Sequence, residues 1–271
     1  MRLRVAAGLL VAAAFVAVAA PLTACGWRFG ASVALHRWLC AVLRMRMRRY
    51  GEPGPGRRLI VANHVSWLDV LALGATEPMA FLAKSEVGSS AWTRWLVDLQ
   101  GVVYVERARW RRIPEVNAEM SRRMTAGGPV TLFAEATTSD GTRLLRFRSS
   151  HFEAARRAEA YVQPVYLDYR AIGGLSATRA EKPIVAWYGD MAFLPSLWRV
   201  LACGGLACDI HYGDAIAYDP TADRKALARR AEAALRELKA RTRRGARNRS
   251  SPGTAIWRFC PRYGGCSPAA A

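Results

Sequence analysis

His64 and Asp69 are the residues whose types and spacing could carry out proton transfer. They stand in the run NHVSWLD at 63–69, directly after the apolar stretch at 59–62. An aspartate bonded to one imidazole nitrogen fixes the tautomer and stabilises the imidazolium, so the other nitrogen can take a proton from an alcohol. The pair therefore indicates a general base, although a lone His-x-x-x-x-Asp spacing is a weak signal that also suits a capping or core histidine.

Glu135 is a further candidate, because it follows the apolar run at 130–134, where a carboxylate needs a partner. The cysteines do not have the spacing that is typical of a metal-binding or redox site. The six cysteines, at 25, 40, 203, 208, 260 and 266, include no C-x-x-C pair. We therefore expect no metal site and mostly structural thiols.

The elements that must position these residues alternate between short apolar runs and helical patterns. Strands are predicted at 59–62, 79–83, 101–105, 130–133, 161–166, 184–188 and 209–212, and helices at 67–74, 91–99 and 113–125. A last amphipathic helix is predicted from the cap-like run at 219–221 to about Lys239. The alternation predicts an α/β fold with a mostly parallel sheet flanked by helices. In such sheets ligands bind outside the carboxyl ends of the strands, which is where His64 stands.

The N-terminal segment could insert into a membrane, as a single helix or within a helical hairpin. After Arg2 and Arg4, residues 5–27 carry no charge and are long enough to span or nearly span a bilayer. A cleaved lipoprotein signal ending at Cys25 is the rival interpretation. The basic residues at 36–49 favour an uncleaved anchor with a cytoplasmic flank. Residues 33–47 predict a helix that either lies on anionic headgroups or is an ordinary surface helix.

The chain is strongly basic, with 40 Lys and Arg against 21 Asp and Glu and a formal net charge of +19 at pH 7. This balance predicts a polyanionic partner, although a bias toward GC-rich codons would also enrich arginine. The basic residues lack the aromatic interleaving of a nucleic-acid groove, so we expect an anionic lipid surface and no nucleic acid. We expect an N-terminal anchor and interfacial helix at 1–50, the globular domain at 51–240 and a basic, disordered tail at 241–271.

Four blocks between residues 59 and 169 resemble the signature of the 1-acylglycerol-3-phosphate and lysophospholipid acyltransferase family. They are NHVSWLD at 63–69, GVVYVER at 101–107, FAEATTS at 133–139 and VQPV at 162–165. The third block is usually Phe-Pro-Glu-Gly-Thr-Arg-Ser, so Ala134, Ala136 and Thr138 depart from the pattern. If Ala136 needs a positive φ, it is strained by roughly 1 kcal/mol or more.

The resemblance implies that a lysolipid hydroxyl attacks an acyl thioester directly. His64 would be the general base and Asp69 the residue that orients it. Acyl carrier protein or coenzyme A would deliver the acyl group as co-substrate, and no cofactor is implied. The absence of a Gly-x-Ser-x-Gly elbow agrees with a mechanism without an acyl-enzyme.

The resemblance also implies a set of substrate-binding residues. Arg107 and Glu135 would position the acceptor head group, and Thr137 and Ser139 would shape its pocket. The complete expected set is Asn63, Ser66, Arg107, Glu135, Thr137, Thr138 and Ser139.

The acceptor that the resemblance favours first is 1-acylglycerol-3-phosphate, which would give phosphatidic acid in phospholipid biosynthesis. Arg107 suits its phosphate, because a guanidinium binds phosphate bidentately. Thr138 offers only a hydroxyl, and the third block with residues 147–150 and 187–191 resembles a branch that acylates phosphate-free lyso-ornithine lipid, the second choice. A non-catalytic protein that binds anionic lipid is the alternative from another class. We expect the protein at the cytoplasmic face of the cell inner membrane.

Overall fold

The computed structural model describes residues 28–84, 103–105, 113–173, 175–176, 185–189 and 191–248. The expected anchor at 5–27, the expected helix at 91–99, Arg107 and residues 249–271 lie outside the described residues. None of the described helices combines the length and the apolar character that crossing a membrane requires. The division into anchor, globular domain and tail stays a prediction.

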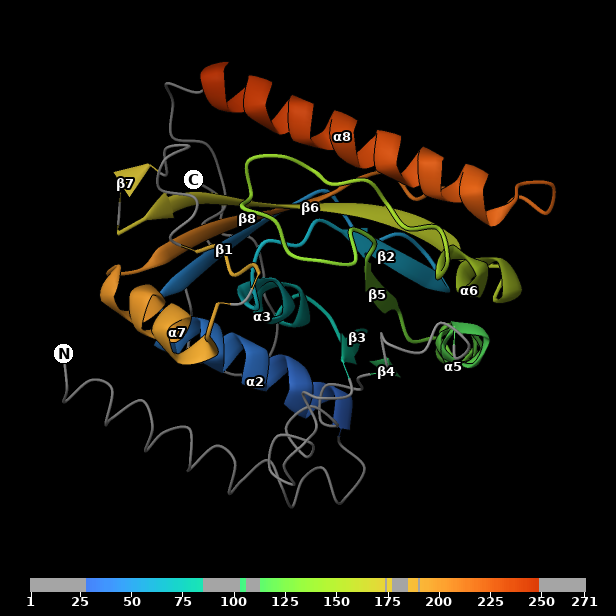
Figure 1. Ribbon diagram of the computed structural model, residues 1–271, viewed down its shortest axis with the longest axis horizontal. Helices are drawn as coiled ribbons and strands as arrows, with labels where there is room; N and C mark the ends of the chain where they lie inside the picture. The colour runs from blue at the N-terminus through green and yellow to red at the C-terminus, as the bar shows by residue number, and fades with distance from the viewer. Residues whose placement is uncertain are drawn as a thin grey trace, which may run out of the picture.

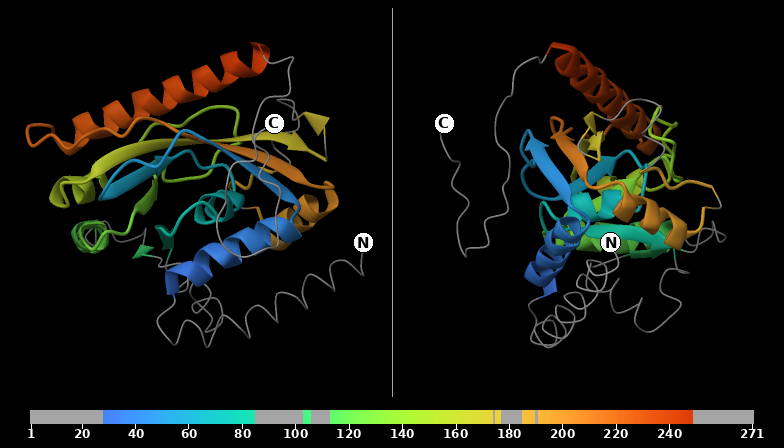
Figure 2. Two further views of the ribbon diagram at one scale, coloured as in Figure 1. Left: turned by 180° about the vertical axis from the view of Figure 1, so that it is seen from behind. Right: turned by 90° about the vertical axis from the view of Figure 1, so that its left-hand side faces the viewer.

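An eight-stranded sheet forms the centre of the described structure (Figures 1 and 2). Its strands are β1 (Met45–Tyr50), β2 (Arg58–Ala62), β3 (Ala80–Lys84), β4 (Val103–Val105), β5 (Val130–Phe133), β6 (Tyr161–Ile172), β7 (Leu175–Ser176) and β8 (Leu206–Tyr212). The order is β1-β8-β6-β2-β5-β3-β4, with β7 paired to β6. The pairs of β6 with β8 and with β7 are antiparallel and the others are parallel. The predicted mostly parallel α/β sheet is confirmed.

Helices cover both faces of this sheet (Figure 1). They are α2 (Arg28–Val42), α3 (Leu68–Gly74), α5 (Ile113–Thr125), α6 (Phe152–Arg157), α7 (Phe193–Ala202) and α8 (Arg224–Asn248). One core, which includes Cys40, Leu68 and Val200, joins α2, α3 and α7 to the sheet. A second core, which includes Met120 and Phe152, joins α5, α6 and α8 to it. Burial from both sides explains why β2, RLIVA, is buried at every position and why residues 59–62 of this strand form one apolar run.

The N-terminal part of the sheet differs from the sequence prediction. The helix expected at 33–47 ends at Val42, and Met45–Tyr50 forms strand β1, which pairs in parallel with β8. Met45 is buried in the core and Met47 packs against it, while arginines alternate with them along the strand. The alternation is the period-two signal of a strand at a sheet edge, where charged side chains are tolerated.

The C-terminal helix is longer than predicted. α8 begins after Asp223, whose carboxylate accepts a hydrogen bond from the backbone N–H of Ala226 at 2.6 Å, as an N-cap does. It continues to Asn248, so residues 241–248 are helical where we expected an irregular tail. Arginine is a good helix former, and the basic composition of this segment is compatible with an exposed helix.

Two more segments depart from the prediction. The described residues 185–189, where we expected a strand, form no strand, because Trp187 donates its backbone N–H to Val65 at 2.9 Å instead of joining the sheet. Helices α6 and α7 were not predicted. α6 is only six residues long, and α7 contains Pro195, which a helix tolerates in its first turn.

The turn after β5 contains Ala136 at a φ of 57°. Its N–H donates to the carbonyl of Phe133 at 3.0 Å, which closes the turn. This is the left-handed region, where a Cβ clashes with the following carbonyl and costs about 1–2 kcal/mol relative to glycine. The condition under which the sequence predicts strain at Ala136, a positive φ, is therefore met.

Replacing Ala136 with glycine should raise the free energy of unfolding by about 0.5–1 kcal/mol, because relief of the strain exceeds the added chain entropy of glycine. Denaturant unfolding of the purified full-length protein measures the change. The matched control is Ala233→Gly on the exposed side of α8, which should lower the same quantity by about 1 kcal/mol. A destabilised Ala136→Gly protein would contradict the strain at this turn.

Candidate active site

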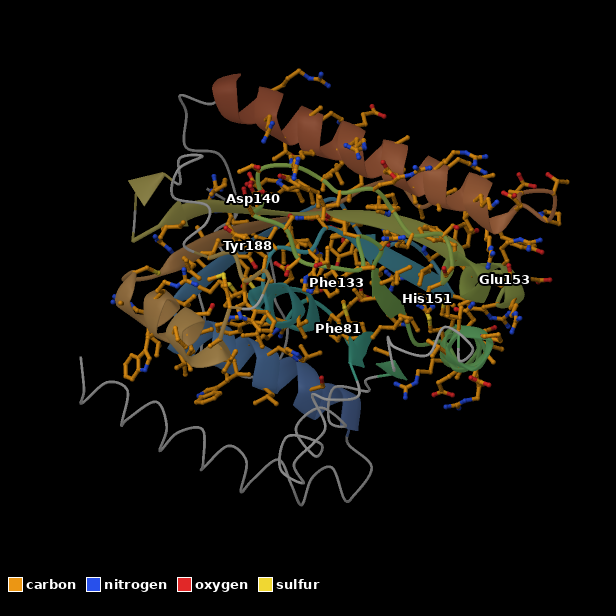
Figure 3. The ribbon with its side chains drawn as sticks, viewed as in Figure 1. Phe81, Phe133, Asp140, His151, Glu153 and Tyr188 are labelled. Carbon is orange, nitrogen blue, oxygen red and sulfur yellow. The ribbon has the colours of Figure 1, made fainter. Side chains whose placement is uncertain are left out.

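The candidate site lies where two parallel strands of the sheet, β2 and β5, end beside β6, which continues to Ile172. Ala62 at the end of β2 pairs with Phe133 at the end of β5 and with Val165 in β6. His64 follows β2 and Glu135 follows β5, so both side chains come from the carboxyl edge of the sheet; Phe133 is labelled in Figure 3. This is the place where open α/β sheets bind their ligands.

Asp69 is fully buried and holds the turn that carries His64. Its Oδ2 accepts a hydrogen bond from His64 Nδ1 at 2.9 Å. The same oxygen accepts the backbone N–H groups of Val65 at 2.6 Å and Ser66 at 2.8 Å. Asp69 stands in the first turn of α3, so its carboxylate ties the start of this helix to the turn that contains His64. The imidazole is thereby held in the tautomer that protonates Nδ1.

Tyr169 supplies a fourth hydrogen bond to Asp69, which sequence reasoning missed. Its hydroxyl donates to Asp69 Oδ1 at 2.7 Å. Burial, and after it the negative charge of Asp69, hold the pKa of Tyr169 well above its usual range, so the phenol remains a donor. The available signal was the period-two pattern of β6, which places Tyr169 on the same core-facing side as Val165 and Leu167.

The other contacts of His64 fix its ring and its main chain. The ring stacks on Phe133 with centroids 4.0 Å apart and an interplanar angle of 13°. Its carbonyl accepts the backbone N–H of Ser139 at 2.9 Å. Within the ranges that the structure describes, Nε2 has no hydrogen-bond partner. This partly exposed nitrogen is the one that can receive a proton from a substrate.

Glu135 uses both carboxylate oxygens on the main chain. Oε1 accepts the N–H of His64 at 3.1 Å, and Oε2 accepts the N–H of Leu145 at 2.9 Å. The side chain is buried, and burial raises the pKa of Glu135 to about 7 against the lowering effect of these two hydrogen bonds. Glu135 therefore joins the His64 turn to the segment after the third block, and its expected contact with an acceptor head group stays a prediction.

Asn63 and Ser66 are also buried beside His64. The side-chain amide of Asn63 donates to the carbonyl of Leu167 at 3.1 Å, and its oxygen accepts the N–H of Leu167 at 2.8 Å. Asn63 thus extends the pairing of β2 with β6 beyond the end of the strand. The hydroxyl of Ser66 is enclosed and has no hydrogen-bond partner among the described residues.

The remaining candidates lie in the third block or outside the described ranges. Ser139 is buried, and its hydroxyl lies within 3.4 Å of the His64 carbonyl and accepts the N–H of Gly141 at 3.3 Å. Thr137 is exposed and Thr138 is half-buried in the turn after β5. Arg107 is not among the described residues.

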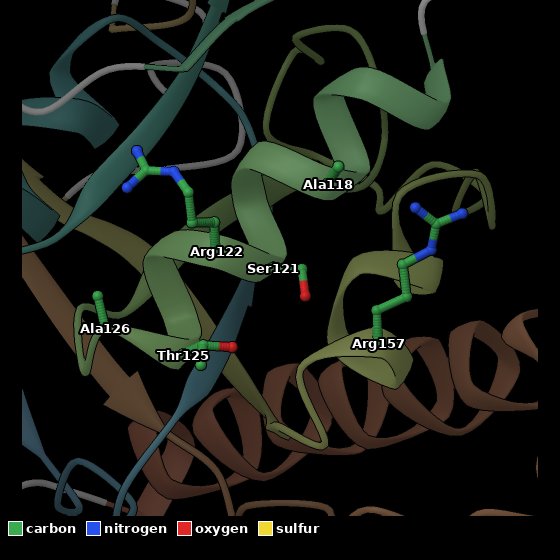
Figure 4. Close-up of a pocket in the computed structure, with 6 residues that line it drawn as sticks. All are labelled: Ala118, Ser121, Arg122, Thr125, Ala126 and Arg157. Carbon is green, nitrogen blue, oxygen red and sulfur yellow. The ribbon is translucent and has the colours of Figure 1, made fainter.

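An open hollow of about 510 Å³ lies elsewhere, between α5 and α6 (Figure 4). It is lined by Ala118, Ser121, Arg122, Thr125, Ala126 and Arg157. None of these is a candidate residue, so the hollow has no part in the chemistry at His64. The described residues also contain no group of three or more His, Cys, Asp or Glu that could hold a metal ion.

The raised pKa of Glu135 predicts a pH dependence of stability. Because the pKa rises from 4.5 to about 7 on folding, the protonated form is favoured in the fold. The contribution of Glu135 to the free energy of unfolding is present below pH 4.5 and is lost as the pH rises through 7, by on the order of 3 kcal/mol. The unfolding free energy of wild type minus that of Glu135→Gln should therefore fall between pH 4.5 and 7.5.

The matched control is Glu119→Gln. Hydrogen bonds from Arg122 and Arg123 lower the pKa of Glu119 to about 2, so its contribution changes only below pH 4.5. The difference between wild type and Glu119→Gln should stay constant over the same range. If the Glu135 difference is equally constant, the carboxyl does not titrate as its burial requires.

Comparison with known proteins identifies the family. A model of the acyltransferase family matches residues 47–168. The lyso-ornithine lipid O-acyltransferase of Rhizobium meliloti is 38% identical over 80% of this chain and 79% of its own length. That of Brucella abortus is 36% identical over 79% and 83%. The 1-acyl-sn-glycerol-3-phosphate acyltransferase of Neisseria gonorrhoeae is 30% identical over 77% and 80%.

A solved structure shares the fold. The crystal structure of the 1-acyl-sn-glycerophosphate acyltransferase PlsC from Thermotoga maritima superposes with a TM-score of 0.59, covering 83% of this chain and 81% of that one. At 15% identity this likeness shows the fold alone. The relatives, with identities of 30% to 38% over more than three quarters of both chains, show more: this chain belongs to the acyltransferase family.

Proposed function

We propose that this acyltransferase moves a fatty acyl group from an acyl-carrier-protein or coenzyme A thioester to the free hydroxyl of lyso-ornithine lipid. The observation that supports the chemistry is the buried Asp69, which holds His64 while Nε2 has no hydrogen-bond partner in the described part of the chain. The observation that supports the acceptor is the higher identity to two lyso-ornithine lipid O-acyltransferases than to a glycerophosphate enzyme. We therefore propose lyso-ornithine lipid as the first choice, whereas the sequence motifs alone favour 1-acylglycerol-3-phosphate.

The proposed reaction follows from the geometry of His64. Nε2 takes the proton of the acceptor hydroxyl as the oxygen attacks the thioester carbonyl. The new C–O bond forms, the C–S bond breaks, and the imidazolium returns its proton to the leaving thiolate. Asp69 stabilises the imidazolium between these steps through its short contact to Nδ1.

The third block supports an acceptor without a phosphate. Both oxygens of Glu135 are engaged by backbone N–H groups, and Thr138 offers a hydroxyl where the family pattern has an arginine. A phosphate dianion would be bound more favourably if this turn carried a second cation. 1-Acylglycerol-3-phosphate stays the second candidate, because Arg107 of the second block suits a phosphate.

We place the reaction at the cytoplasmic face of the cell inner membrane. The apolar segment at 5–27 and the net charge of +19 support an anionic membrane surface as the partner. The basic residues lack the aromatic interleaving of a nucleic-acid groove, so the proposal includes no nucleic-acid partner. The acidic acyl carrier protein would be attracted by the same positive charge.

Removing the proposed base should nearly abolish acyl transfer. His64→Ala should lower kcat by about 10²- to 10⁴-fold. Tyr169→Phe, which removes one hydrogen bond to a charged group, should lower kcat about tenfold with KM unchanged, because it loosens Asp69 without touching substrate. Steady-state kinetics with purified full-length protein measure both.

Tyr166→Phe is the control for the tyrosine series. Tyr166 is equally buried on β6 but belongs to the opposite core, and its rate should match wild type. A folded His64→Ala protein with wild-type turnover would exclude the mechanism. A Tyr169→Phe protein whose kinetics match those of Tyr166→Phe would exclude a positioning role for Tyr169.

The acceptor assignment predicts the outcome of a competition assay. With both acceptors at equal concentration, wild type should acylate lyso-ornithine lipid in preference to 1-acylglycerol-3-phosphate. Thr138→Arg, which supplies the missing cation, should shift the ratio of kcat/KM toward the phosphate acceptor about tenfold.

Thr137→Arg adds the same charge one residue earlier on the exposed side of the turn and should shift this ratio less. Preferred acylation of 1-acylglycerol-3-phosphate by wild type would overturn the proposed acceptor. The mass of the lipid product, read by mass spectrometry, decides between the two.

A further inference from the structure

Helix α7 and the segment before it expose an unusual set of aromatic side chains. The exposed fractions of Tyr188, Phe193 and Trp198 are 41%, 46% and 50%. These are three of the four large hydrophobic residues that are exposed in the described structure, so they form a local feature rather than a general one. Tyr188 is labelled in Figure 3, on the side of the molecule where α7 lies.

One side of α7 is firmly packed. Ser196 and Val200 are buried, and Leu197 packs against the same core as α2 and α3. Trp198 and Arg199 lie on the other side of this amphipathic helix, while Phe193 stands in its first turn, on the packed side but still exposed. A rigid helix of this kind can present bulky side chains to a surface without the entropy cost of ordering a loop.

Cations lie beside the aromatic side chains. Arg199 is exposed next to Trp198, and α7 contains no acidic residue. Arg44, also exposed, lies beside the start of β8, because its carbonyl accepts the N–H of Leu206 at 3.2 Å, four residues after the end of α7. Neither arginine has an acidic partner among the described residues. Aromatic rings flanked by unpaired arginines match the two layers of an anionic lipid surface.

α7 is also bonded to the turn that carries the proposed base. Trp67 lies in the run between His64 and Asp69, and its indole N–H donates to Ser196 Oγ at 3.2 Å. The rings of Trp67 and Phe193 meet edge to face with centroids 5.3 Å apart. In addition, Trp187 donates its N–H to Val65, so two segments join α7 to the His64 turn.

We propose that the exposed surface formed by Tyr188, by Phe193 in the first turn of α7 and by Trp198 and Arg199 on the outer side of this helix is a docking surface for the anionic lipid bilayer. Interfacial helices insert their apolar face about 5–10 Å into the headgroup region, with cations at the phosphates. Docking through α7 brings the His64 turn to the lipid surface by way of Trp67, where the hydroxyl of a membrane-bound lysolipid can reach Nε2. The proposal rests on the proposed function only in requiring that the acceptor be a membrane lipid.

The test reads the surroundings of Trp198 directly, so it does not depend on other membrane contacts of the chain. Full-length wild type and Trp198→Phe are reconstituted into vesicles of phosphatidylglycerol with brominated acyl chains. Because the chain has nine tryptophans, the difference between the two emission spectra isolates Trp198. The bilayer should quench most of this difference emission, and aqueous acrylamide should quench it little.

Tyr218→Trp provides the control at an exposed site beyond the other end of β8 from α7. The emission that it adds should be quenched by acrylamide and not by the brominated lipid. Trp198 emission that behaves in the same way would overturn the proposal, since α7 would then face water. Protection from both quenchers would also overturn it, because protein would cover the helix, either a second copy or residues 1–27. The acceptor assay reads a different quantity, so its failure would leave this result standing.

Discussion

The carboxylate of Asp69 is fully buried, and the arrangement of the site depends on how that charge is satisfied. An ionised carboxylate without partners is among the most unfavourable groups to bury in a protein interior. Here three donors from the His64 turn meet one oxygen, and Tyr169 from β6 meets the other. Three of the donors lie in the His64 turn, the fourth lies in β6, and Asp69 itself lies in α3. Satisfying this one charge therefore fixes the positions of these three segments relative to one another. The same contacts leave Nε2 as the nitrogen that can act on a substrate.

The sequence predicted the sheet and this pair of residues for physical reasons. β2 is buried on both faces, so its residues 59–62 form a continuous apolar run, and His64 follows in the segment that also contains Asp69. Both residues are separated by five positions, so a short turn brings them together and no long-range information is needed. The positive φ of Ala136 was predictable for the same reason, because a block usually containing glycine implies a local backbone conformation.

The features that the sequence did not predict depend on contacts between distant segments. Tyr169 lies 100 residues from Asp69 along the chain, and nothing in its neighbourhood distinguishes it from any core tyrosine. The sequence pattern predicts that most of β1 continues the preceding helix, because its arginines resemble those of a basic segment at a membrane surface. In the structure, pairing with β8 at the edge of the sheet makes this segment a strand. Residues 185–188 have the composition of a strand. Instead of pairing with a strand, however, the backbone N–H of Trp187 donates to the carbonyl of Val65, next to His64.

The third block shows why a motif locates residues better than it assigns their roles. Its position at the end of β5 follows from the sequence pattern, yet Glu135 and Ser139 both bond to the main chain of His64. The two contacts act on opposite polar groups of one residue, the N–H and the carbonyl, so together they fix the peptide planes on either side of His64. The strained Ala136 lies between them in sequence, and the tight turn there is what lets both neighbours reach the same residue. In this chain the third block therefore holds the main chain of His64 in place, and its two threonines, Thr137 and Thr138, make no such contact and carry no charge.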